Sequence, residues 1–107
     1  MRVVESIDIR VDDLESLSVA ILCGKGNNGG DGFVVARQLR QRGCFPMVAV
    51  FASPGDIKGD ARINFDILTA IGCKPLFIQS EAEWNRKRAE ILAADVVVDA
   101  LLGSGLS

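Results

Sequence analysis

The sequence predicts an α/β protein in which a parallel sheet is covered by helices on both faces. Short apolar runs that fit strands buried on both faces alternate along the chain with amphipathic runs that fit helices. Glycine or proline follows or precedes most of these runs. Such alternation is typical of right-handed crossovers, which place successive strands in one parallel sheet.

The first expected strand and helix flank a glycine-rich segment. Residues 18–23 are almost continuously apolar and end at a glycine, as in a strand buried on both faces. Residues 31–42 are expected to form a helix, because Phe33, Ala36 and Leu39 recur at helical spacing. Arginines concentrate near the end of this run and a glycine follows it, as at many helix C-termini.

Three further strands and two further helices are expected downstream. The strands are placed at 46–51, 75–78 and 95–99, and the helices at 60–71 and from 81 to about 94. Three isoleucines recur every four residues from Ile63 to Ile71, beside Leu68, which predicts an apolar stripe on the first of these helices. Ser80 followed by Glu83 is a capping box that predicts the start of the second helix.

The segment 24–32, Gly-Lys-Gly-Asn-Asn-Gly-Gly-Asp-Gly, is expected to be a binding loop. Glycines permit positive φ and close approach of a ligand to the backbone, and the start of the following helix favours anions such as phosphates. The side-chain oxygens of Asn27, Asn28 and Asp31 suit a hard cation. The segment therefore predicts a nucleotide- or ion-binding turn.

Two known phosphate-binding patterns fit this segment incompletely or not at all. Gly24-x-Gly26-x-x-Gly29 matches the dinucleotide-binding fingerprint, but the acidic residue that should end the second strand is missing. The first acid after that strand is Asp56, beyond a Ser-Pro-Gly turn. A P-loop is excluded, because Gly29 is followed by Gly-Asp rather than by Lys and Ser or Thr.

Composition limits the function classes. The chain has 107 residues, enough for one domain, and its net charge of −2 gives no electrostatic reason to expect nucleic-acid binding. No apolar run is long enough to cross a membrane, and the acidic N-terminal residues do not fit a secretory signal. Three cysteines without metal-ligand spacing favour buried thiols in a reducing, cytoplasmic compartment. The sequence contains no histidine, so Ser-His and Cys-His catalysis are excluded.

The expected topology brings two loops together. Ligands of open parallel sheets bind beyond the carboxyl ends of the strands. The loop after the first strand and the loop after the fourth, at 100–107, both fall at that edge. We therefore expect Asn27, Asn28, Asp31 and Asp99 on one side of the molecule.

Two separated motifs resemble those of a known family. Residues 23–37, Cys-Gly-Lys-Gly-Asn-Asn-Gly-Gly-Asp-Gly-Phe-Val-Val-Ala-Arg, and 97–106, Val-Val-Asp-Ala-Leu-Leu-Gly-Ser-Gly-Leu, resemble the NAD(P)H-hydrate epimerases, the YjeF N-terminal domain family. The resemblance covers residues 18–107 and implies a Rossmann-like three-layer sandwich. It also implies an activity: interconversion of the R and S forms of NADH or NADPH hydrated at C6 of the nicotinamide ring, in nicotinamide nucleotide repair.

The resemblance implies roles for particular residues. Asn28 and Asp99 fall on potassium-ligand positions, so K⁺ is the expected cofactor. Asp99 is also the candidate catalytic acid or base, with Asp31 second. The sequence leaves open whether Asp99 moves a proton, holds the ion or only forms a turn at the strand end. The implied substrate contacts form two groups: Asn27, Asn28, Gly29, Gly30 and Asp31, then Gly103, Ser104, Gly105, Leu106 and Ser107.

The resemblance also implies partners. The small-molecule substrate is the hydrated nucleotide NAD(P)HX, and the functional partner is an NAD(P)H-hydrate dehydratase encoded in the same gene or separately. A homodimer is a further expected assembly, whereas neither nucleic acid nor a membrane is expected as a partner.

The sequence departs from the family at both ends. Residues 1–17 match its N-terminal helical segment poorly, and its later strands, one ending in an Asp-x-Pro-Ser-Gly-like motif, are missing. The chain at 1–107 therefore resembles a single partial domain, apparently truncated after the fourth strand, with an exposed sheet edge and helix face. Two functions stay open: an epimerase whose competence in this chain is undecided, and a non-catalytic nucleotide-binding or protein-interaction module derived from the same domain. An NAD-dependent dehydrogenase is disfavoured by the missing acid after the second strand and by the lack of His and Tyr.

Overall fold

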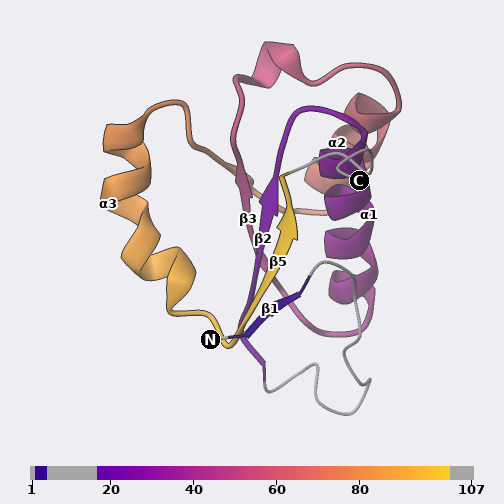
Figure 1. Cartoon of the computed structure of the whole chain (residues 1–107). Helices are drawn as coiled ribbons and strands as arrows, with labels where there is room; N and C mark the ends of the chain where they lie inside the picture. The colour runs from indigo at the N-terminus through magenta and orange to yellow at the C-terminus, as the bar shows by residue number, and fades with distance from the viewer. Residues whose placement is uncertain (1, 5–16, 102–107) are drawn as a thin grey trace.

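The chain folds around a parallel sheet, as expected (Figure 1). The structure is a computed structural model that describes residues 2–4 and 17–101. Within these residues the sheet has five strands in the order β1-β5-β2-β3-β4, and every pair of neighbours is parallel. The strands are β1 (Arg2–Val4), β2 (Val19–Cys23), β3 (Met47–Val50), β4 (Leu76–Phe77) and β5 (Val96–Ala100).

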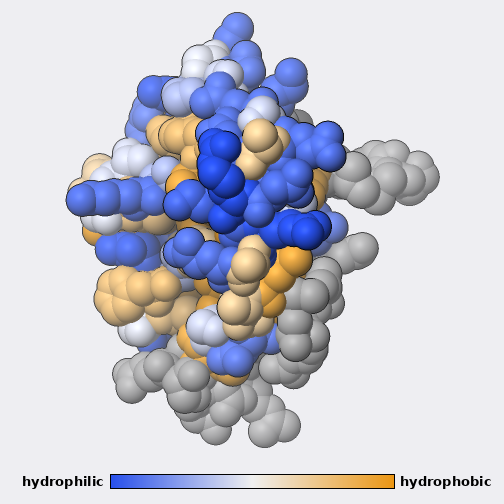
Figure 2. Space-filling model, turned by 90° about the vertical axis from the view of Figure 1, so that its left-hand side faces the viewer, coloured by the Kyte–Doolittle hydropathy of each residue, from blue (hydrophilic) through white to orange (hydrophobic). Residues whose placement is uncertain are grey.

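Helices cover both faces of the sheet, which gives the three-layer sandwich. In Figure 1, α1 (Asn27–Gln41) and α2 (Gly59–Ala70) lie together on one side of the strands, and α3 (Glu81–Leu92) lies on the other. A short 3₁₀ turn, η2 (Pro54–Asp56), connects β3 to α2. Figure 2 views the α3 side, where hydrophilic residues cover the middle of the face and the polar side of α3 meets solvent.

The alternating side chains of the central strands build two apolar clusters. Val96 and Val98 of β5 face α1 and α2, where they join the larger cluster around Phe33 and Leu68. Val97 faces α3 and joins the smaller cluster that contains Ile91. The continuous apolar runs predicted strands buried on both faces, and that prediction is confirmed.

The strand β1 was not expected from the sequence. It pairs in parallel with β5, with Arg2 opposite Val96 and Val4 opposite Val98. Without β1, the edge of β5 would carry unpaired N–H and C=O groups. A short extended segment such as β1 can form hydrogen bonds with these groups. The sheet therefore does not end at β5.

Helix α1 begins earlier than its apolar pattern predicts. The expected start was Asp31, but the helix begins at Asn27, after Gly26 as N-cap, and the Gly30 N–H donates to the Gly26 carbonyl over 3.1 Å. Glycines are poor helix formers, so intrinsic propensity argues for a loop here. Packing of this turn against the sheet overrides that propensity.

The C-terminal ends of α1 and α2 were predicted correctly. Gly43 and Gly72 follow the two helices with φ of 90° and 105°, the left-handed conformation that glycine adopts easily. The Arg40 guanidinium, in the last turn of α1, donates a hydrogen bond of 3.2 Å to the Ile71 carbonyl at the end of α2. This bond satisfies one carbonyl of the α2 terminus and ties the two helices together.

The start of α3 was also predicted correctly. The Glu83 N–H donates to Ser80 Oγ over 3.1 Å, and Glu83 Oε1 accepts from the Gln79 N–H over 3.0 Å. The carboxylate thus reaches one residue further back than in the usual capping box. On the inner side of the helix, the Trp84 ring packs 5.5 Å from the Phe51 ring, centroid to centroid, and anchors α3 to the sheet.

The prediction that the isoleucines of α2 line an apolar stripe against the core is wrong. Ile63 is 59% exposed and Ile71 is 44% exposed. A strict spacing of four residues drifts by about 40° per step around a helix, so it leaves the buried face. Phe65 and Leu68, three residues apart, lie on the buried face. The Phe65 ring packs edge-on against the Phe33 ring, with 5.5 Å between the ring centroids.

This correction makes a testable contrast within α2. We expect Leu68→Ala to lower the free energy of unfolding by about 2–5 kcal/mol, because it opens a cavity in the core. Ile63→Ala on the exposed side should change it by less than about 0.5 kcal/mol. Urea unfolding followed by circular dichroism measures both. Equal losses for the two variants would contradict the assignment of the buried face.

Candidate functional site

The first part of the candidate site is the start of α1. The N–H groups of the first turn of a helix have no partner within the helix, and together with the helix dipole they favour an anion. Here that turn follows the carboxyl end of β2 after only three residues, 24–26. Gly29 and Gly30 lie in the helix rather than in a loop, and the exposed Asp31 lies in its second turn.

The glycines of this segment provide space rather than unusual backbone angles. The described glycines with positive φ are Gly43, Gly59 and Gly72, so those within 24–32 do not use the positive φ that glycine permits. A Cβ at Gly29 would overlap the Gly24 carbonyl oxygen, and one at Gly32 would lie 2.6 Å from Cys23 Sγ. Close contact between helix and strand therefore requires glycine at these positions.

The second part of the site is the carboxyl end of β5, where Asp99 is half-buried. Asp99 pairs with Leu22 of β2 in the sheet register, and Leu22 belongs to the cluster on the α3 side. The Asp99 side chain therefore faces the α3 side of the sheet, whereas Asp31 is carried by a helix on the opposite face. Asp99 Oδ1 accepts a 3.0 Å hydrogen bond from the Leu101 N–H, which forms a tight turn just after the strand.

The two parts meet through their backbones. The Gly24 N–H donates to the Ala100 carbonyl over 3.1 Å, and a Cβ at Gly24 would lie 2.7 Å from the Leu101 carbonyl oxygen. The loop after β2 and the chain after β5 are thus in direct contact at the carboxyl edge, as the topology predicted. The contact of Gly24 with Leu101 was missed. Its only signal in the sequence is a glycine directly after a buried strand.

The structure describes some of the predicted site residues and not others. Asn27 and Asn28 begin α1, and their side chains lie outside the described part of the chain. The predicted second group lies wholly outside the described residues. It comprises Gly103, Ser104, Gly105, Leu106 and Ser107. The roles assigned to both groups remain predictions.

The Asp99 carboxylate has one oxygen in a hydrogen bond and one without a described partner. Asp99 Oδ1 is engaged by Leu101, and Oδ2 makes no hydrogen bond within residues 2–4 and 17–101. The same residues contain no group of three His, Cys, Asp or Glu placed to share a metal ion.

The three cysteines are free, buried thiols, as expected. Burial raises the pKa of Cys23 to about 12, and the nearby Cys73 adds to the shift. A thiol with so high a pKa stays protonated at neutral pH and is not a nucleophile. Cys23 is a packing residue, with its Sγ lying against Gly32 of α1.

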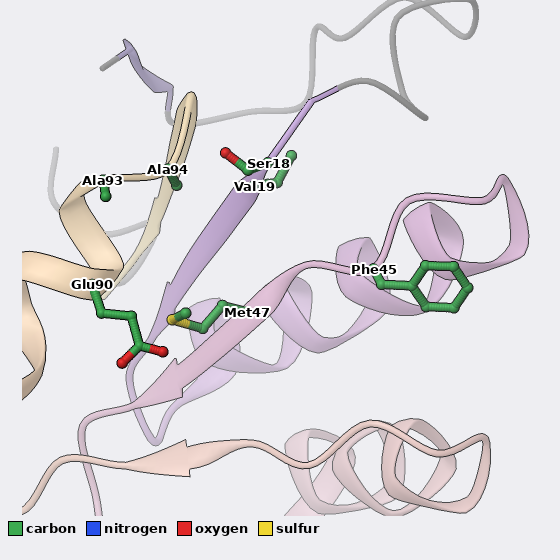
Figure 3. Close-up of a pocket in the computed structure, with 7 residues that line it drawn as sticks. All are labelled: Ser18, Val19, Phe45, Met47, Glu90, Ala93 and Ala94. Atoms are coloured by element: carbon green, nitrogen blue, oxygen red, sulfur yellow. The ribbon is translucent and has the colours of Figure 1, made fainter.

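A cavity of about 290 Å³ lies at the opposite end of the sheet (Figure 3). Val19 and Met47, at the amino ends of β2 and β3, line it together with Ala93 and Ala94 after α3. In Figure 3 the Glu90 side chain extends from α3 toward β3. The strands run away from this cavity, so it is not part of the candidate site.

Among the described residues, no helix is both long and apolar enough to span a membrane.

Fold and site define an open parallel α/β domain with a glycine-bearing helix start beside a strand-end aspartate. The chain belongs to the family described as YjeF-related protein N-terminus, whose model matches residues 1–107. This assignment confirms the family resemblance seen in the motifs.

Curated relatives agree with this family. The chain is 46% identical over 106 residues to the bifunctional NAD(P)H-hydrate repair enzyme Nnr of Moorella thermoacetica, covering 98% of the chain and 20% of that protein. It is 44% identical over 88 residues to the NAD(P)H-hydrate epimerase of Rhodopirellula baltica, covering 82% of the chain and 34% of that protein. The epimerase of Rhodobacter capsulatus is 42% identical over 101 residues, covering 94% of the chain and 43% of that protein. The chain thus spans less than half the length of these relatives.

A solved structure supports the fold. The crystal structure of the yeast protein YNL200c superimposes with a TM-score of 0.65 at 26% identity, covering 87% of this chain and 37% of that one. This likeness confirms the Rossmann-like arrangement of strands and helices.

The close contact of α1 with the loop after β2 gives a second prediction. Gly29→Ala should lower the free energy of unfolding by about 2–3 kcal/mol, because the methyl group overlaps the Gly24 carbonyl. Gly55→Ala is the matched control, since a Cβ there has nothing within 4 Å. Urea unfolding of both variants checks this, and equal stabilities would contradict the packing role of Gly29.

Burial of Cys23 gives a third prediction, on pH dependence. The unfolded thiol ionises near its ordinary pKa of 9.0, and the folded one near 12. The unfolded chain therefore binds fewer protons between these values, so the stability due to the protonated thiol is full below pH 9 and is lost as pH rises toward 12. We expect the free energy of unfolding to fall as pH rises through this window. In Cys23→Ala the fall should be less steep, and the two slopes should differ by up to about 1.4 kcal/mol per pH unit. Denaturant unfolding in reducing buffer measures the slopes, and identical slopes would refute the buried thiol's contribution.

Proposed function

We propose that this chain forms the first half of an NAD(P)H-hydrate epimerase domain, which interconverts the R and S forms of hydrated NADH and NADPH. The observation that carries the proposal is the junction at the carboxyl edge, where the Gly24 N–H, three residues before α1, donates to the carbonyl of Ala100, the residue after Asp99. The names of the relatives in Rhodopirellula and Rhodobacter support it. Because the chain spans only part of their length, the activity of the whole domain is a proposal.

The proposed binding role falls to the start of α1. Its unpaired N–H groups and dipole favour the phosphates of a dinucleotide, and the glycines keep this turn close to the sheet. Asn27, Asn28, Gly29, Gly30 and Asp31 are the proposed contacts on this side. Gly103 to Ser107 would contact the substrate from the other loop.

The proposed chemistry needs a proton donor and acceptor near the nicotinamide ring. C6 of the hydrate bears a hydroxyl group and is bonded to the ring nitrogen. When the C–O bond breaks, the hydroxyl leaves with a proton as water and the nitrogen lone pair forms an iminium cation. Water then adds to the opposite face and loses a proton, which inverts the centre. In this proposal Asp99 Oδ2, which has no hydrogen-bond partner among the described residues, moves the proton, and the carboxylate charge stabilises the cation.

We also propose K⁺ as the cofactor. Asn28 and Asp99 are the residues that would hold it, and the single available oxygen of Asp99 suits a monovalent cation. When bound, the ion would supply positive charge beside the substrate's phosphates. The roles of Asp99 as ion ligand and as acid or base remain alternatives.

The wider setting follows from the same proposal. A dehydratase that acts on the S form, carried on the same polypeptide or on a separate one, is the expected functional partner. The name of the Moorella relative, a bifunctional repair enzyme, favours such a pairing. A homodimer and a cytoplasmic location stay predictions from the sequence.

The second candidate is a non-catalytic nucleotide-binding or protein-interaction module. The start of α1 favours it, because the N–H groups of a helix start can bind phosphates without any proton-transfer residue. A half-site with one proton-transfer residue can still bind a dinucleotide. The two candidates differ in whether the charge of Asp99 is required.

The test follows conversion of pure (R)-NADHX to its S epimer by chromatography, with purified chain in potassium buffer. We expect a rate above the no-protein control that falls about 100-fold or more in Asp99→Asn. Asp66→Asn is the matched control, because the Asp66 carboxylate lies on the exposed side of α2 in an ion pair with Arg62. A wild-type rate equal to the spontaneous one would refute the epimerase activity of this chain and leave the binding module.

A further inference from the structure

One peptide group beyond the end of β5 is held from both sides. The Ala100 carbonyl accepts the Gly24 N–H over 3.1 Å, and the Leu101 N–H donates to Asp99 Oδ1 over 3.0 Å. This carbonyl and this N–H belong to the same peptide unit, which is planar. Any tilt of that plane therefore changes both hydrogen bonds together.

A third contact limits the position of the next carbonyl. A Cβ at Gly24 would lie 2.7 Å from the Leu101 carbonyl oxygen and 3.5 Å from its carbon. Backbone atoms cannot rotate away as the end of a flexible side chain does. Only glycine at position 24 lets Leu101 stay where its N–H meets Asp99.

We propose that Gly24 is a positioning residue for Asp99, acting through the peptide between Ala100 and Leu101. Gly24 holds this peptide in place, and the peptide in turn holds Asp99 Oδ1, so that Oδ2 is the oxygen left for substrate or ion. Asp99 thus forms a turn with one oxygen and serves the site with the other. The consequence for catalysis rests on the proposed function, whereas the backbone coupling does not.

Three variants separate the parts of this coupling. Gly24→Ala adds a methyl group against Leu101 and keeps the carboxylate. Asp99→Asn removes the charge but keeps a side-chain oxygen that can accept the Leu101 N–H, since asparagine forms the same turn. Asp99→Ala removes both. Gly26→Ala is the control, because it adds the same methyl two residues away with nothing within 4 Å.

The first readout is amide hydrogen exchange of Gly24 and Leu101, measured by NMR on the full chain. In Gly24→Ala we expect Leu101 to exchange about tenfold faster, and in Asp99→Ala we expect both amides to do so. Asp99→Asn and Gly26→Ala should stay within about twofold of wild type. If Gly24→Ala does not fold, the comparison of the two Asp99 variants decides alone. Unchanged exchange of Gly24 in Asp99→Ala would overturn the proposal.

The second readout is epimerisation of (R)-NADHX. A displaced Asp99 that keeps its charge should lower kcat by about 10- to 100-fold in Gly24→Ala with little change in KM. A wild-type chain without activity refutes the proposed function, and the exchange pattern then still confirms or overturns the coupling. An active wild type with an unaltered kcat in Gly24→Ala overturns the positioning role.

Discussion

The close packing of α1 against β2 and β5 is the constraint on which the rest of the structure depends. Gly29 lies against the backbone after β2, and Gly32 lies against Cys23 at its end. At these points the helix contributes no side chain: Gly29 meets the Gly24 backbone, and Gly32 meets the Cys23 side chain. The helix therefore begins close to the carboxyl ends of β2 and β5, and its first N–H groups and Asp99 share one edge of the sheet although they are far apart in the sequence.

The central strands could be predicted closely because their environment dictates their composition. Strands β2, β3 and β5 were each expected within one residue of their observed bounds, since burial on both faces requires a continuous apolar run. Helix features were predicted less evenly. The start of α1 was missed because glycine propensity argues against a helix, and the face of α2 was misassigned because isoleucines at equal spacing looked like a stripe. In both cases tertiary packing decided, and packing is not visible in local spacing.

The candidate site could be predicted in its location but not in its detail. Topology alone brought the glycine-rich turn and Asp99 to one edge. The contact of Gly24 with Leu101 could not be predicted. It involves a backbone carbonyl, which every residue carries, so the residue type at position 101 gives no sign of it. The sequence also left open whether Asp99 only forms a turn or takes part in the reaction as an ion ligand, acid or base. The hydrogen bond from Leu101 uses only one of its two oxygens, so the alternatives are compatible.

Strand β4, the edge strand farthest from β1, affects how copies of this chain can contact one another. Strand β4 contributes only Leu76 and Phe77 to the ladder. A free strand edge is a template on which another polypeptide can extend the sheet, and the hazard grows with the length of the edge. Two residues offer too few peptide groups to anchor a neighbour. Crowded copies of this domain are thereby protected from growing into a shared sheet along that side.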